Sequence, residues 1–220
     1  MSDDGIELPP GIALEDPRPI AASAPYTFEM PWPEEVASLG PGDYAKAIFL
    51  GIDAEGRPCA ERMWVTIERV DAGFVSGHLD NEPLDMPAIK LDDPVRIPMT
   101  HVIACSFREG SARPNVLERR SYWERCFVDA CVVEGRSHAD YLYREEPDMT
   151  REGDQYADSG WRIRGTDEAI AEDERLGEKA MYIALGKVLN ADDRWLHLID
   201  REIGCAFQWD AGSDDYIELA

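Results

Sequence analysis

Alternation of apolar and polar side chains over residues 43–79 restricts the first part of the chain to antiparallel β-structure. The run YAKAIFLGI is rich in strand-forming residues, and the turn DAG separates RMWVTIERV from GFVSGHLDN, as in a hairpin. Successive side chains of a strand point to opposite faces, so Met63, Val65 and Ile67 share one face. Pro98 interrupts the later run VRIPMTHVIACSF and indicates an edge or a bend. We predict a small β-barrel-like domain over residues 41–112.

The segment before this domain is rich in proline, with seven prolines in residues 1–35. We predict an extended, partly disordered arm over residues 1–40, with little order before Tyr26. The aromatic side chains of Tyr26, Phe28 and Trp32 could hold the arm against a domain surface.

The second half of the chain mixes both kinds of element. Residues 110–125, with Pro114 near the start, are predicted to form a helix that joins the halves. FVDACVV and HADYLYR flank the turn EGRS as a second hairpin, and GWRIR is a short strand. TDEAIAEDERLGE is a surface helix capped by Thr166. Short strands and one helical turn near Arg194 follow, so we predict an α+β domain over residues 113–220 and the α+β class for the whole chain.

Charge and motif content exclude several function classes. The 220 residues carry a formal net charge of −23, with acidic side chains in excess in both halves. Such a surface repels nucleic-acid phosphates and anionic membranes, which leaves two possibilities, a basic protein as partner or no macromolecular partner. The four histidines are widely separated and no common nucleotide-binding or hydrolase motif occurs, so we predict neither metal nor cofactor and assign no catalytic residue.

Cysteine usage and the N-terminus indicate the cellular compartment. The five cysteines are scattered, odd in number and without a CxxC pair, which is typical of reduced thiols. The acidic, proline-broken start lacks the pattern of a secretion signal, and no apolar run is long enough to span a membrane. We therefore expect a cytoplasmic protein.

The acidic stretch around Trp161 provides the candidate binding residues. Trp161 follows Ser159-Gly160 and precedes Arg162. Its ring could fill the core at the start of a strand, or it could form a partner-binding surface together with Arg162, since Trp and Arg are enriched in interface hot spots. The turn YREEP and the acidic helix could be ordinary solvated or salt-bridged surface, or they could present carboxylates to a basic partner. The candidate binding residues are Trp161, Arg162, Arg144, Glu145, Glu146, Asp167, Glu168 and Glu172.

Two segments resemble known families. RMWVTIERVDAGFVSGHLDNEPLDMPAIKLDDPVRIPMTHV resembles domain of unknown function 2314, through Met63-Trp64-Val65, Asn81-Glu82-Pro83 and Leu91-Asp92. The C-terminal part resembles the immunity protein 33 family, also called domain of unknown function 2185, through Tyr143 to Pro147, Asp158 to Arg162, Gly204 and Phe207. Immunity proteins neutralise toxins by binding them, so this resemblance implies a binding function and brings no catalytic residue. The loop between Pro147 and Asp158 is longer than the family pattern.

Three functions remain open from the sequence. The first is a non-catalytic, acidic protein-binding module of the immunity type, whose partner is a basic protein such as a toxin. The second is an enzyme or sensor that binds a small polar ligand between the two domains, with Arg162, Arg164 and nearby carboxylates. The third is a self-associating module in which the β domain forms a homodimer.

Overall fold

A computed structural model describes residues 6–219, which form two compact units. The N-terminal unit comprises the chain up to Ser23 together with Phe28–Arg119, and the C-terminal unit comprises Ala24–Thr27 together with the chain from Arg120 onward. The predicted boundaries at residues 40 and 112 stay predictions.

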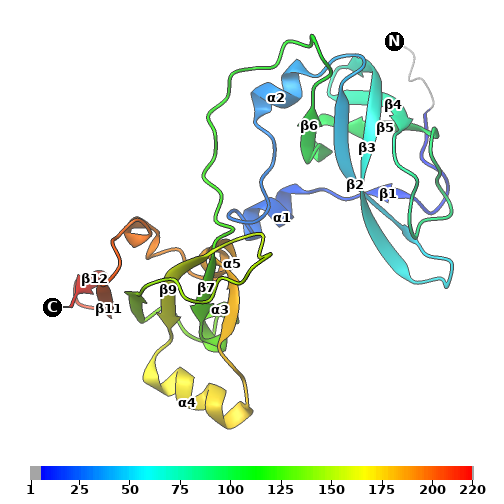
Figure 1. Ribbon diagram of the computed structural model, residues 1–220. Coiled ribbons are helices and arrows are strands. Elements are labelled where there is room, and N and C mark those ends of the chain that lie inside the picture. Colours follow the sequence, from blue (N-terminus) through cyan, green and yellow to red (C-terminus); the bar gives the residue numbers. More distant parts are fainter. Residues whose placement is uncertain (1–5, 220) are drawn as a thin grey trace. The chain divides into compact units, whose positions relative to one another are not determined.

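The N-terminal unit is built on an antiparallel sheet with the strand order β1-β2-β3-β4-β5 (Figure 1). Its strands are β1 (Ala13–Leu14), β2 (Tyr44–Ile52), β3 (Pro58–Asp71), β4 (Phe74–Leu79), β5 (Pro94–Pro98) and β6 (Ala104–Ser106), of which β6 also pairs with β2. The predicted hairpin is confirmed as β3 and β4, and Met63, Val65 and Ile67 face the core. The predicted bend is confirmed too, because the 3-10 turn η1 (Met99–His101) separates β5 from β6.

Three short elements lie within the predicted arm, whose residues 1–5 are outside the described range. They are β1, α1 (Arg18–Ser23) and α2 (Pro33–Ser38). β1 and α1 precede Tyr26, in the stretch for which we predicted little order. β1 is held by backbone pairing, with Ala13 opposite Leu50 and Leu14 opposite Phe49.

The C-terminal unit holds a mixed sheet with the strand order β10-β7-β9-β8-β11-β12. β7 and β9 run parallel, and the other neighbours are antiparallel. The strands are β7 (Arg125–Val128), β8 (Tyr141–Arg144), β9 (Asp158–Arg164), β10 (Met181–Ala184), β11 (Ala206–Asp210) and β12 (Asp215–Glu218). The helices are α3 (Ala130–Val133), α4 (Asp167–Leu176) and α5 (Leu185–Ala191), with a 3-10 turn η2 (Leu196–Leu198). The predicted α+β class is confirmed.

The helix predicted over residues 110–125 is wrong. No helix occurs there, and β7 begins at Arg125. The side chain of Leu117 is 82% exposed, and its carbonyl accepts a hydrogen bond from Trp32 Nε1 at 3.0 Å. A short helix is stable mainly when an apolar face is buried, and this segment buries no such face. It is an extended connection instead.

The predicted second hairpin is also wrong. β8 pairs with β9 and β11, because the later strand β9 enters the sheet between β7 and β8. After β7 the chain turns into α3 rather than continuing as strand. By contrast, the strand predicted at GWRIR is confirmed as part of β9. The predicted acidic helix is confirmed as α4, with the Thr166 side chain accepting a hydrogen bond from the Ala169 amide at 3.3 Å.

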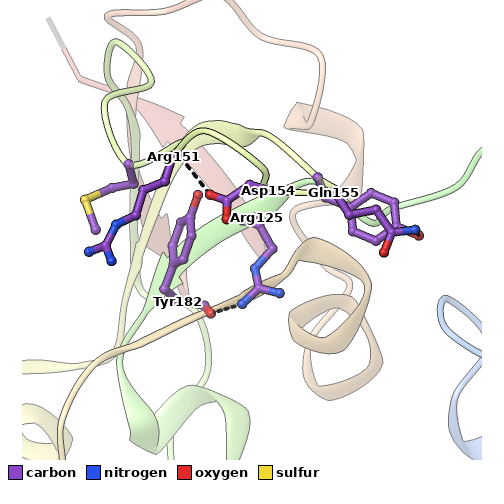
Figure 2. A pocket seen from close by; sticks show the side chains of 7 residues that line it. Arg125, Arg151, Asp154, Gln155 and Tyr182 are labelled. Carbon is purple, nitrogen blue, oxygen red and sulfur yellow. Dashed lines mark hydrogen bonds between the residues drawn. The ribbon is translucent and has the colours of Figure 1, made fainter.

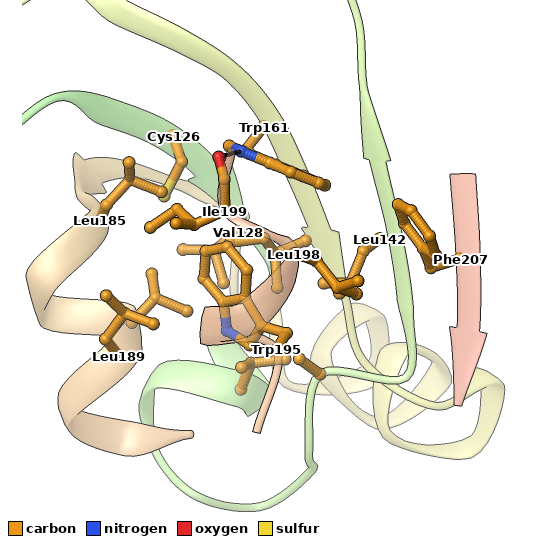
Figure 3. Packing of buried hydrophobic residues seen from close by; sticks show 14 of the residues in the cluster. Cys126, Val128, Leu142, Trp161, Leu185, Leu189, Trp195, Leu198, Ile199 and Phe207 are labelled. Atoms are coloured by element: carbon orange, nitrogen blue, oxygen red, sulfur yellow. Dashed lines mark hydrogen bonds between the residues drawn. The ribbon is translucent and has the colours of Figure 1, made fainter. Parts of the chain in front are cut away.

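One face of the C-terminal sheet packs on α5 and η2 to form the core of this unit (Figure 3). Inward side chains of four strands meet apolar side chains of the two helical elements and of the segment between them. The strands contribute Cys126, Val128, Leu142, Trp161, Ile163 and Phe207; the helical side contributes Leu185, Val188, Leu189, Trp195, Leu198 and Ile199. The run over residues 179–190 was predicted to be strand, but only its β10 portion is, and its later part forms α5. A short apolar run does not distinguish a buried strand from a buried helix.

Candidate partner-binding surface

Trp161 lies in the core of the C-terminal unit. Its side chain is fully buried, its Nε1 donates a hydrogen bond to the Ile199 carbonyl at 3.1 Å, and its ring centroid is 5.7 Å from that of Trp195 (Figure 3). Of the two roles considered for Trp161, the structure supports the core role. The ring offers no surface to a partner in this conformation.

Arg162 is buried beside Trp161 and binds carboxylates instead of facing solvent. Its Nη1 and Nη2 donate to both oxygens of Asp158 at 3.0 and 2.9 Å, and its Nε donates to Glu145 at 2.6 Å. A longer contact of 3.3 Å joins Nη2 to Asp148. These hydrogen bonds raise the pKa of Arg162. Burial alone would raise the pKa of Asp158, but the bonds from Arg162 and from the Gly160 amide outweigh it, so that pKa is lowered.

The buried pair fixes the segment 145–157, which we call the acidic loop. Glu145 and Asp148 bind Arg162 from one end of the loop, and the Met149 amide donates to Asp158 at 3.3 Å. Gly160 has a φ of +81°, and a Cβ there would lie 2.2 Å from the Glu145 carbonyl oxygen, so only glycine fits. Glu145 and Asp148 thus anchor the loop, and its other carboxylates are exposed and do not bind Arg162: Glu146, Glu152 and Asp154.

Arg144 also has a structural place. Its Nε donates to the Ser159 carbonyl at 3.0 Å and its Nη1 to the Arg201 carbonyl at 2.7 Å, with the guanidinium 5.8 Å from the centre of the Trp161 ring. It lies on the core face of β8, opposite Trp161 in the register. Arg144 therefore joins three segments of the backbone around Trp161.

The candidate residues of α4 lie apart from the acidic loop. The loop precedes the start of β9 and α4 follows its end, so roughly 20 Å of strand separates them (Figure 1). Asp167 and Glu168 are exposed, and Glu172 pairs with Arg175. Asp173 is buried and joins α4 to α3, accepting from the Cys131 amide at 2.9 Å. The eight predicted binding residues thus form two acidic segments and an internal cluster, not one patch.

Between the two acidic segments lies the second face of the sheet, which the sequence analysis missed. The strand register places Tyr182, Phe127, Arg162 and Tyr143 in one row across β10, β7, β9 and β8. Tyr141 and Arg164 form a neighbouring cross-strand pair. The four aromatic side chains are half-buried, and the rings of Tyr141 and Tyr143 stack with centroids 5.5 Å apart. We call Phe127, Tyr141, Tyr143, Tyr182 and Arg164 the aromatic face. Alternation within YLYR could have indicated it.

Two hollows flank the aromatic face. One, of about 350 Å³, is lined by Tyr141, Arg164 and Gln208 of the sheet and by residues at the start of α4. The other, of about 490 Å³, lies between Arg125 and Tyr182 of the sheet and the acidic loop. Half-exposed aromatic and arginine side chains with charged residues around them are the composition that protein interfaces favour.

The described residues show neither a metal centre nor a membrane span. Within residues 6–219, no group of three or more His, Cys, Asp or Glu side chains is placed to hold a metal ion. No helix in this range is long and apolar enough to cross a membrane.

Comparison with known families gives one result for the C-terminal unit. No curated protein and no solved structure matches the chain. The N-terminal part has no family assignment, so its resemblance to domain of unknown function 2314 stays a proposal. Residues 126–219, which are most of the C-terminal unit and less than half of the chain, match the family model described as Immunity protein Imm33 domain.

Proposed function

We propose that this chain is an immunity protein that binds a protein toxin through the aromatic face of its C-terminal unit. The observation that carries the proposal is the match of residues 126–219 to the immunity protein family, in a unit whose sheet leaves one aromatic face uncovered by the core helices. A binding role needs a surface with rigid anchors, and Tyr141 and Tyr143 sit on a strand paired on both sides.

Charge favours a basic toxin. The net charge of −23 attracts a positively charged partner, and the acidic loop and α4 place exposed carboxylates at both ends of the aromatic face. Charges at the rim of an interface speed association more than they strengthen the final complex. The aromatic face therefore supplies affinity, and the acidic segments supply the rate of encounter.

Co-expression with a toxin tests the proposal directly. The chain is expressed with the toxin domain encoded beside its own gene, and survival of the host cells is scored. We expect protection by the wild-type chain and loss of protection by Tyr141→Ala and Tyr143→Ala, because truncation of an interface hot spot weakens binding by about 2 kcal/mol, roughly thirtyfold. Circular dichroism of the purified variants shows that the fold is retained.

Charge reversal separates the two contributions. Glu146→Lys and Glu168→Lys should lower the association rate with the toxin and weaken its salt dependence, leaving the dissociation rate nearly unchanged. Glu55→Lys in the N-terminal unit is the matched control. Because Glu55 lies outside the proposed surface, this change should have no local effect on the association or the dissociation rate. Full protection by the two tyrosine variants would contradict the proposed surface. The alternatives, a small polar ligand bound between the units or self-association through the β domain, stay hypotheses.

A further inference from the structure

The larger hollow beside the aromatic face carries two arginine side chains (Figure 2). Its walls are Arg125 of β7, Tyr182 of β10 and the loop segment that carries Arg151, Asp154 and Gln155. Two guanidinium groups thus line one hollow of about 490 Å³ in a chain of net charge −23. A local excess of positive charge against that background needs a physical reason.

Two polar atoms in this wall lack hydrogen-bond partners. Arg125 Nε and Tyr182 Oη are both shielded from solvent, and neither has a partner among residues 6–219. A buried polar group without a partner costs about 1–3 kcal/mol, and more when it is charged. Figure 2 shows the Tyr182 ring rising from β10 toward the loop at Asp154. Burial and the nearby Asp158 and Asp154 carboxylates raise the pKa of Tyr182, so its hydroxyl stays protonated and able to donate.

The arginines of this hollow are not neutralised by the protein. Arg125 donates from Nη2 to the Tyr182 carbonyl, and its guanidinium lies 5.1 Å from the centre of the Tyr182 ring. Within the described range, no carboxylate lies within ion-pair distance of Arg125 or Arg151. Asp154 accepts a hydrogen bond from the Arg151 amide at 2.8 Å. Asp158, which also lies near Tyr182, is neutralised by its pair with Arg162, so Arg125, Arg151 and Asp154 leave a local balance of about one positive charge.

We propose that this hollow binds a single carboxylate group. Arg125 and Arg151 provide only donors, the protonated Tyr182 hydroxyl can donate one further hydrogen bond, and a carboxylate provides only acceptors. Arg151 and Gln155 are exposed loop side chains that line the same hollow. The proposal requires the shielded donors of Arg125 and Tyr182 to become accessible to the ligand when it binds. A phosphate dianion fits less well, because Asp154 and the acidic surface repel a second negative charge. The carboxylate comes either from a free organic acid or from an acidic side chain on a basic protein.

Three probes test carboxylate binding and its source. Glutarate represents the free acid. The acetylated, amidated peptide Lys-Lys-Glu-Lys-Lys represents the protein-borne carboxylate, and the same peptide with Gln in place of Glu reports general attraction to the acidic surface. Affinities are measured by titration calorimetry at about 0.15 M salt, where long-range attraction is screened. We expect the Glu peptide to bind about tenfold more tightly than the Gln peptide, as charge-assisted hydrogen bonds would require.

Two variants locate the binding. Tyr182→Phe removes one hydroxyl, and Arg151→Gln removes one exposed charge, so neither should unfold the chain. Both should reduce the preference for Glu over Gln to below about threefold and weaken any glutarate binding. Tyr122→Phe, outside the hollow, and Arg57→Gln, in the N-terminal unit, are the matched controls and should keep the preference.

The outcomes separate this inference from the immunity function. If glutarate binds and the Glu peptide binds no more tightly than the Gln peptide, the site takes a free acid. If the Glu peptide is preferred and glutarate does not bind, the site takes a carboxylate on a protein partner. Both results support a carboxylate site. Only the choice of a basic peptide rests on the proposed function. Equal binding of the two peptides with no glutarate binding, or a preference that survives in both variants, overturns the inference. If the wild-type chain binds the probes but does not protect cells in the co-expression assay, the result counts against the immunity function and not against the carboxylate site.

Discussion

Replacement of Arg162 by methionine should strongly destabilise the C-terminal unit. The guanidinium is 6% exposed and its partner Asp158 is 0% exposed, so the variant leaves a carboxylate buried without its counter-charge. Breaking a buried ion pair by removal of one partner costs about 3–5 kcal/mol. Asp158 keeps hydrogen bonds from the Gly160 and Met149 amides, which offset part of the loss. We expect a decrease of about 3 kcal/mol in the free energy of unfolding.

Arg164→Met is the matched control on the same strand. Arg164 is 41% exposed, whereas its partner Asp129 is only 10% exposed and keeps a hydrogen bond from the Gly165 amide at 3.1 Å. Solvent can replace part of the interaction of Arg164, so the loss should be smaller than for Arg162, about 1 kcal/mol. The two variants differ in burial but not in the chemistry of the change, and the difference between them isolates the effect of burial.

Urea unfolding followed by tryptophan fluorescence measures both variants. Trp161 and Trp195 are fully buried in the C-terminal unit and report its unfolding. A double variant, Asp158→Leu with Arg162→Met, should be more stable than Arg162→Met alone, because it removes the unpaired charge. If Arg162→Met costs no more than Arg164→Met, or if the double variant is the least stable, then the buried pair does not anchor the loop as described.

Three further predictions follow from the same region. Gly160→Ala should destabilise by about 1–3 kcal/mol in urea unfolding, since its Cβ would meet the Glu145 carbonyl, whereas Gly153→Ala, with a φ of +92° but open space around it, should cost less. The lowered pKa of Asp158 adds stability that is complete above the unfolded-state value near 4 and is lost as pH falls through the folded-state value, so urea midpoints at pH 3 should lie well below those at pH 7. Burial raises the pKa of Cys126 to about 12, so a thiol reagent at pH 8 should modify this residue only after unfolding.

The N-terminal sheet could be predicted from sequence because its strands follow one another along the chain. β3 and β4 are joined by a two-residue turn, and alternation around Val65 fixes which face is buried. The C-terminal sheet could not be ordered in the same way. β9 enters between β7 and β8 from a later part of the chain, and local patterns carry no information on such pairing.

The candidate site was predictable in part. The acidic loop and α4 were identified by composition, but the position of Arg162 was not, because arginine is mostly exposed unless it is paired. Its partner Asp158 lies four residues away along the same strand, two residues before a glycine with positive φ. The spacing of Asp158 and Arg162 along a strand does not reveal that both side chains are buried, because their burial depends on the acidic loop that covers them.

Anchoring the acidic loop from beneath has a consequence for how this protein can diversify. Glu146, Glu152 and Gln155 are exposed, and none of their side chains binds Arg162. Exchanges at exposed positions of this kind change stability by only about 0.5 kcal/mol. Exposed positions of the loop can therefore be substituted while the buried Asp158–Arg162 pair stays constant, which would suit the proposed function if the toxin that is bound changes over time.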